Sequence, residues 1–269
     1  MSNELPAGIA AVVERITVPP TPATELPTEV TGELRALLTW WSSVSAGAAP
    51  NATVIESGTG DWPTASEAMA SGIAAAERAV DAGATVLVPR ATVRDDTTAR
   101  SLVAVLTRLD PSTVVPQPEG MTDRTWMATV ATVRDDAFRL TPERGDSVAL
   151  LDSAGAATIG FVAGVLLGAA ARQTPCLIDG TDELCAALVA DRMSARARGW
   201  WTAGSQSPDP ARRAAADRIA FAPGLPLALT DNRGLGAQTT LEVLRLLAQT
   251  GPSTVGTDGD DGTDDQARQ

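Results

Sequence analysis

The feature that most constrains this chain is a regular alternation of short apolar segments with longer amphipathic segments, from about residue 61 to residue 250. Short apolar strands that alternate with helices are typical of βαβ units, which build a parallel sheet. The sequence therefore predicts an α/β protein: a three-layer, Rossmann-like domain with a mostly parallel sheet of about five or six strands, plus a small helical subdomain. The predicted strands are 85–89, 147–151, 175–178, 200–202 and 226–229.

Several predicted helices begin or end at recognisable capping residues. Thr64, followed three residues later by Glu67, resembles a capping box that opens a helix which Gly83 ends. Asp209 followed by proline is typical of an N-cap and the first helical turn, and Gly155 is predicted to begin the helix that follows it. The predicted helices are 7–16, 33–44, 64–82, 97–109, 122–138, 156–172, 182–197, 210–219 and 235–249.

The composition along the chain divides it into three parts. Residues 1–45 are predicted to form an N-terminal helical segment with a proline-rich linker, and residues 46–250 the α/β domain. Within the second part, 46–59 is interpreted as a loop or as a loop with a short strand at 52–55. Residues 251–269 hold many aspartates and little apolar surface, which predicts a disordered acidic tail.

The chain contains no histidine, which excludes the commonest general base, a Ser-His-Asp triad and imidazole metal sites. Its two cysteines, Cys176 and Cys185, lie in apolar segments and are predicted to be reduced packing thiols. We expect neither a metal nor a cofactor.

The formal net charge of −12 argues against a nucleic-acid or anionic membrane surface as partner, because both need a basic stripe on the protein. The apolar run 159–171 is too short to span a bilayer, and no N-terminal apolar leader is present. These observations predict a cytoplasmic protein.

Three motifs near the C-terminus carry a family resemblance. They are Gly204-Ser205-Gln206-Ser207-Pro208-Asp209-Pro210-Ala211-Arg212, then Pro223-Gly224-Leu225-Pro226-Leu227-Ala228-Leu229, and then Gly234-Leu235-Gly236-Ala237-Gln238-Thr239-Thr240. Their spacing resembles the nicotinate-nucleotide:dimethylbenzimidazole phosphoribosyltransferase family of cobalamin biosynthesis. That family has Gly-His-x-Ser-x-Glu-Pro-Gly-His at the first place and Leu-Gly-Glu-Gly-Thr-Gly at the third. Here Ser205 and Arg212 stand at the two histidine positions, and Leu235 replaces the glutamate that the family uses as general base.

Two earlier segments extend the resemblance. Residues 90–98 stand where the family has a glycine-rich phosphate loop, and of that loop only Thr97 and Thr98 match. Asp96 as an N-cap is one interpretation of this segment, and phosphate attraction by Arg90 and Arg94 is the other. Ile178-Asp179-Gly180 matches a Leu-Asp-Gly of the family at a strand end, where Asp179 either lines the site or caps the next helix.

The resemblance implies substrate binding by a defined set of residues. They are Arg90, Thr97, Thr98, Asp179, Gly180, Gly204, Ser205, Ser207, Gly234 and Gly236. Arg90, Arg94, Arg212 or Arg233 would hold a phosphate. Asp179 and Asp231 are the possible substitutes for the missing catalytic carboxylate.

Two functions remain open. The chain either transfers phosphoribosyl from nicotinate mononucleotide to a benzimidazole-type base, or it is an inactive paralogue that binds a nucleotide-like ligand or regulates an active partner. The ligand is in both cases a small nucleotide or aromatic base. The resemblance also implies a homodimer, with Trp40, Trp41 or the helix 159–171 as candidate contact surfaces.

Overall fold

A computed structural model describes residues 5–22, 31–92, 96–220, 224–229 and 234–249. Its centre is a parallel sheet in which the strands follow one another in chain order, β1-β2-β3-β4. These strands are β1 (Ala52–Glu56), β2 (Val86–Arg90), β3 (Cys176–Ile178) and β4 (Trp201–Ala203). The predicted α/β class with a parallel sheet is confirmed, and the short strand considered at 52–55 is β1.

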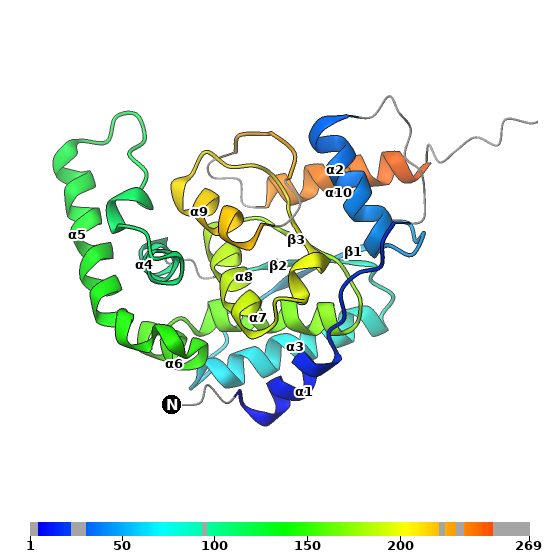
Figure 1. Cartoon of the computed structure of the whole chain (residues 1–269), viewed down its shortest axis with the longest axis horizontal. Coiled ribbons are helices and arrows are strands. Elements are labelled where there is room, and N and C mark those ends of the chain that lie inside the picture. Colours follow the sequence, from blue (N-terminus) through cyan, green and yellow to red (C-terminus); the bar gives the residue numbers. More distant parts are fainter. Residues whose placement is uncertain (1–4, 23–30, 93–95, 221–223, 230–233, 250–269) are drawn as a thin grey trace, which may run out of the picture.

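The helices that matter for the sheet cover both of its faces (Figure 1). On one face α7 packs against both α3 and α8, and Trp201 of β4 donates its indole N–H to the carbonyl of Leu166 in α7 at 3.3 Å. On the other face α10 shares a cavity wall with Val54 and Val88 of the first two strands. The helices described are α1 (Ala7–Arg15), α2 (Gly32–Val44), α3 (Ala65–Asp81), α4 (Asp96–Thr107), α5 (Asp123–Leu140), α6 (Ser147–Ala154), α7 (Ala157–Ala171), α8 (Thr181–Met193), α9 (Pro210–Ile219) and α10 (Leu235–Gln249), with short 3-10 turns η1 (Pro111–Thr113), η2 (Thr141–Gly145) and η3 (Ala197–Trp200).

Helices α3 and α7 lie in unusually close contact because glycines face the partner backbone. A Cβ atom on Gly72 would overlap the carbonyl oxygen of Phe161, and one on Gly164 would overlap that of Met69. The apolar run predicted at 159–171 is therefore a buried core helix, whose glycines permit a backbone-to-backbone approach. No helix in the described part of the chain is long and apolar enough to cross a membrane.

The N-terminal segment is tied to the turn that precedes β4. The indole N–H of Trp200 donates to the carbonyl of Thr17 at 2.7 Å, and that of Trp40 donates to the carbonyl of Gly199 at 3.0 Å. Trp40 and Trp41 are buried within the chain, and so is nearly all of α7. The prediction that these residues provide a dimer surface is therefore wrong, because this chain already covers them.

Residues 147–151, predicted as a strand, are helical in α6. A short apolar run does not by itself distinguish a strand from a buried helical turn. The end signals decide it: the carboxylate of Asp146 accepts from the backbone N–H groups of Val148 and Ala149, and Gly155 ends the helix at φ +63°. Gly155 was predicted to begin the helix that follows it. That prediction is wrong, because Gly155 ends α6.

The predicted strand 226–229 is also wrong. In this segment Pro226 has no backbone N–H to give to a ladder, and the sheet contact is a single bridge between Ser205 and Leu225. The sheet consequently has four strands in the described residues, where about five or six were expected from the helix–strand pattern. The two cysteines are buried and free, as predicted.

Candidate functional site

The polar residues that follow β3 and β4 meet at one edge of the sheet. Asp179 and Gly180 follow β3, and Gly204 and Ser205 follow β4. The backbone N–H of Gly204 donates to the carbonyl of Ile178 at 2.7 Å, which holds the two strand ends together. Ligands of open parallel sheets bind beyond this carboxyl edge, so it is the natural place for a site.

The first turn of α10 packs directly onto this edge. The backbone N–H of Ala237 donates to Oδ2 of Asp179 at 3.1 Å. Glycines make the approach possible, because a Cβ on Gly204 would lie 2.5 Å from the nitrogen of Ala237, and one on Gly236 would lie 2.5 Å from Oγ of Ser205. A carboxylate at a helix N-terminus is favoured by the helix dipole. Asp179 thus anchors α10, while the N-cap position of α8, the next helix, is Gly180.

Arg212 of α9 lies beside this anchor and is almost fully buried. Its Nη1 is 3.9 Å from Oδ1 of Asp179, and its Nε donates to Oγ1 of Thr181 at 3.4 Å. In the described part of the chain, neither Nη1 of Arg212 nor Oγ of Ser205 has a hydrogen-bond partner, although both atoms are buried. Buried polar atoms normally have a hydrogen-bond partner, so these two atoms are exceptions at the edge of the site.

A second buried charge pair fixes the start of α9. Asp209 is the N-cap and accepts from the backbone N–H groups of Ala211 and Arg212, as its sequence position predicted. Both of its oxygens also accept from Arg100 of α4, at 3.1 and 2.7 Å. Desolvation opposes the charge on Arg100, but the carboxylates of Asp209 and Asp96 together outweigh it and raise the pKa of the guanidinium. The loop therefore holds a fixed shape between Ser205 and α9.

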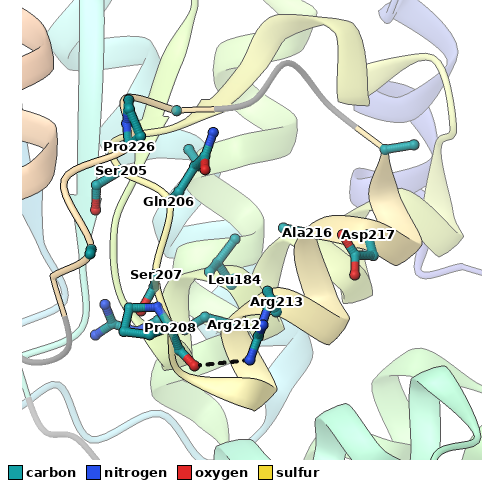
Figure 2. A pocket seen from close by; sticks show the side chains of 14 residues that line it. Leu184, Ser205, Gln206, Ser207, Pro208, Arg212, Arg213, Ala216, Asp217 and Pro226 are labelled. Atoms are coloured by element: carbon teal, nitrogen blue, oxygen red, sulfur yellow. Dashed lines mark hydrogen bonds between the residues drawn. The ribbon is translucent and has the colours of Figure 1, made fainter. Parts of the chain in front are cut away.

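A cavity of about 670 Å³ opens between this loop and α9; we call it cavity A. Figure 2 shows Arg213 and Asp217 along α9 on one wall, Gln206 and Pro226 across from them, and Leu184 between Gln206 and Arg213. Ser205, Ser207 and Arg212 also line it. Its volume lies in the range of small-molecule sites.

A cavity of about 460 Å³, cavity B, lies on the other side of the first turn of α10. Leu235 lines it and is 50% exposed, together with the apolar side chains of Val54 and Val88. Arg90 also lines cavity B, and its Nη1 lies 3.7 Å from Oε1 of Glu56. Its guanidinium lies so close to Gly234 that a side chain at that position would overlap it.

The structure brings some of the predicted site residues together and leaves others apart. Asp179, Gly204, Ser205 and Gly236 form one cluster, and Ser207 lines cavity A beside it. Arg90 and Gly234 belong to cavity B. Thr97 and Thr98 lie in the first turn of α4, which Asp96 begins, and they line neither cavity. Asp231, Arg233 and Arg94 lie outside the described residues.

Sequence reasoning missed Glu183, which is fully buried beneath Gly180. Its Oε1 accepts from the backbone N–H of Ala91 at 2.8 Å, so it ties the end of β2 to α8. A Cβ at Gly180 would overlap the other oxygen of this carboxylate, and Gly180 itself has φ +144°. The available signal was a pair of acidic residues opening an otherwise apolar helix. In the described part of the chain, no group of three or more His, Cys, Asp or Glu side chains is placed to hold a metal ion.

The class of protein that these features define is an α/β protein with a ligand-sized cavity at the carboxyl edge of a parallel sheet. The family model described as "Phosphoribosyltransferase" matches residues 61–251. The nicotinate-nucleotide–dimethylbenzimidazole phosphoribosyltransferase of Mycobacterium ulcerans is 40% identical over 179 residues, 66% of this chain and 50% of that protein. The enzyme of the same name from Mycobacterium tuberculosis is 39% identical over the same shares.

Solved structures agree with this match. The crystal structure of CobT from Thermus thermophilus has a TM-score of 0.62 and 28% identity, covering 69% of this chain and 56% of that one. The chain belongs to the nicotinate-nucleotide:dimethylbenzimidazole phosphoribosyltransferase family. It spans about half the length of the curated relatives that it matches.

Proposed function

We propose that this chain binds a nucleotide-like ligand in cavity A and does not carry out the phosphoribosyl transfer after which its relatives are named. Leu235 stands where the family resemblance places the general base, and an aliphatic side chain accepts no proton. The loss of one positioned base typically costs about 10²- to 10⁴-fold in rate.

The observation that carries the proposal is the use of Asp179. It is the described carboxylate predicted as a substitute base, and its Oδ2 accepts from the N–H of Ala237 while Oδ1 faces Arg212. A general base must reach the proton that it removes. This carboxylate is 5% exposed and is directed at the protein's own helix and arginine, which supports a structural role.

Ligand binding is supported by the polar groups around cavity A. Arg212 supplies a buried positive charge with an unused donor at Nη1, and Arg213 stands on the same helix at the cavity wall. Guanidinium groups bind phosphate and carboxylate through charge-assisted hydrogen bonds. Leu184, Pro226 and Ala228 offer an apolar wall for a ring. We therefore propose an anionic ligand with a flat ring, of the nicotinate mononucleotide type.

Calorimetric titration with nicotinate mononucleotide tests this function. We expect Arg213→Ala to weaken binding by about tenfold, the loss of one charge-assisted hydrogen bond. Arg124→Ala removes the same charge from the exposed side of α5 and serves as the matched control. Binding that is equally strong in the wild type and both variants would contradict cavity A as the site, and no binding by the wild type at millimolar ligand would contradict the function itself.

We also propose that the protein is a cytoplasmic homodimer. Its exposed large apolar side chains include Val54 on β1, and Leu235 and Leu246 on α10. These two elements enclose cavity B, so a partner on this side would cover both. Light scattering should give about twice the chain mass of 27.6 kDa, and Leu246→Glu should return it to the monomer. A wild-type mass of one chain at micromolar concentration would contradict the dimer.

A further inference from the structure

A separate cavity of about 340 Å³ lies between the end of α4 and the last turns of α5, away from both cavities of the candidate site. Three arginines line it, Arg108, Arg134 and Arg144, and we call it the arginine groove. Figure 1 shows α5 standing at the edge of the molecule, so one wall of the groove belongs to a peripheral helix. In a chain with a net charge of −12, this concentration of positive charge calls for an explanation.

The arginines of the groove belong to a larger cluster. Arg192 at the end of α8 donates from Nη2 to the carbonyl of Arg144 at 2.7 Å, which fixes its guanidinium beside the groove. Desolvation and then the positive charges of Arg144, Arg218 and Arg108 lower the pKa of Arg192, against an opposing contribution from Asp191. Arg108, Arg144 and Arg218, from three separate segments of the chain, thus lie within electrostatic range of Arg192.

Little negative charge compensates this cluster. Across the described ranges, Arg108, Arg144 and Arg192 form no ion pair with a carboxylate, whereas Arg134 is paired with Asp135 at 2.8 Å. Asp191, the acidic neighbour, is itself paired with Arg198 at 2.8 Å. Unpaired like charges repel one another, so an anion that enters the groove removes a repulsion in addition to forming its own contacts.

The backbone under Arg108 adds a second, independent observation. Arg108 follows the last residue of α4 and has φ +62°, the left-handed conformation that helices usually end with glycine or asparagine. The side chain of Arg108 lines the groove, at a position where glycine or asparagine would fit the backbone better. The positive charge of Arg108 therefore stands at a backbone position that favours glycine or asparagine.

The other wall of the groove is apolar and open. Phe138 on α5 is 83% exposed, and Leu109 beside Arg108 is 42% exposed. An exposed aromatic ring next to guanidinium groups is suited to a ring that stacks and an anion that is bound by arginine. The groove's volume of about 340 Å³ lies at the lower end of the range for small-molecule sites.

We propose that the arginine groove binds a ligand with two or more phosphate groups, such as inorganic pyrophosphate or a nucleoside triphosphate. Compact phosphates present two to four negative charges to Arg108 and Arg144, which line the groove, with Arg192 hydrogen-bonded to the backbone of Arg144 beside it. A base attached to the phosphates packs on Phe138. The site is distinct from cavity A and shares no lining residue with it.

Calorimetry with sodium pyrophosphate and with adenosine triphosphate tests the proposal. Arg108→Ala and Arg144→Ala should each weaken both ligands by at least about tenfold. Arg78→Ala, which removes the same charge from an exposed position on α3, should leave both within about twofold. Both groove variants should keep the wild-type melting temperature without ligand, because each relieves a repulsion, and should lose the rise in melting temperature that the ligand causes.

The source of the phosphate is decided by Phe138→Ala. Weaker binding of adenosine triphosphate with unchanged binding of pyrophosphate identifies a nucleotide, and equal binding of both ligands to both proteins identifies a phosphate anion. Arg213→Ala separates this site from cavity A, because it should leave pyrophosphate binding unchanged. Wild-type affinity in Arg108→Ala and Arg144→Ala, or no binding of pyrophosphate or adenosine triphosphate by the wild type at millimolar concentration, would overturn the proposal.

Discussion

The buried pair between Asp209 and Arg100 should be the most sensitive polar contact of the site. Asp209→Ala removes the N-cap of α9, which is typically worth about 1 kcal/mol, and leaves Arg100 buried without its partner, which typically costs about 3–5 kcal/mol. We therefore expect a loss of about 4 kcal/mol or more in the free energy of unfolding, a large part of the total for a domain of this size.

Two variants separate the contributions. Asp209→Asn keeps a capping oxygen and loses the charge, so its loss should lie between that of the alanine variant and zero. Asp96→Ala removes the second carboxylate that pairs with Arg100. The Asp96 side chain is 64% exposed and its Oδ2 lies 3.3 Å from Nη2 of Arg100, so its loss should lower the free energy of unfolding by less than about 1 kcal/mol. Urea unfolding followed by tryptophan fluorescence measures all three at equal m values. If Asp209→Ala costs no more than Asp96→Ala, the buried pair does not hold the loop and the reasoning fails.

Three further predictions concern the core and its titration. Gly164→Ala should lower the free energy of unfolding by about 1–3 kcal/mol, because the added methyl group overpacks α7 against α3. Gly8→Ala, which has open space around it in α1, should raise the free energy of unfolding by up to about 1 kcal/mol. Thermal unfolding measures the sign of both changes. Burial raises the pKa of the Cys176 thiol, so Cys176 and Cys185 should react with a thiol reagent only after unfolding in urea, and fast labelling of the native protein would contradict their burial. Burial also raises the pKa of Asp191 above 3.8. Its contribution to stability is therefore present at low pH and is lost as the pH rises through the pKa of the folded state. Unfolding curves from pH 3 to 7 should show the free energy of unfolding of Asp191→Asn increasing relative to that of the wild type as the pH rises.

The parts of the fold that depend on local signals could be predicted from the sequence. The Thr64 side chain accepts from the N–H of Glu67, as the capping box required, and Asp209 caps α9 as its proline predicted. The prediction of a strand at 147–151 was wrong because the apolar composition of these residues suits a strand and a buried helix equally. The capping residues on either side, Asp146 and Gly155, are the sequence signals that distinguish the helix from a strand.

The candidate site depends on contacts that no local pattern encodes. Asp179 and Ala237 are 58 residues apart, and only the packing of α10 on the sheet edge shows that this carboxylate holds a helix. Glu183 is buried because its carboxylate packs against Gly180, where a side chain would overlap it, and reaches the backbone of Ala91, 92 residues away. The identity of the motif residues was visible in the sequence, but whether each side chain faces a cavity or the protein interior was not.

The central claim is that the family's reaction is absent here because Leu235 stands at the position of the general base and Asp179, the described residue predicted to replace that base, is held by Ala237 and Arg212. The most direct test is to incubate the protein with nicotinate mononucleotide and dimethylbenzimidazole and to quantify the riboside phosphate by mass spectrometry. The Mycobacterium tuberculosis relative, run under the same conditions, is the positive control. We predict no product above the enzyme-free background for this chain. A turnover rate within tenfold of the relative would contradict the claim and would show that another group supplies the base.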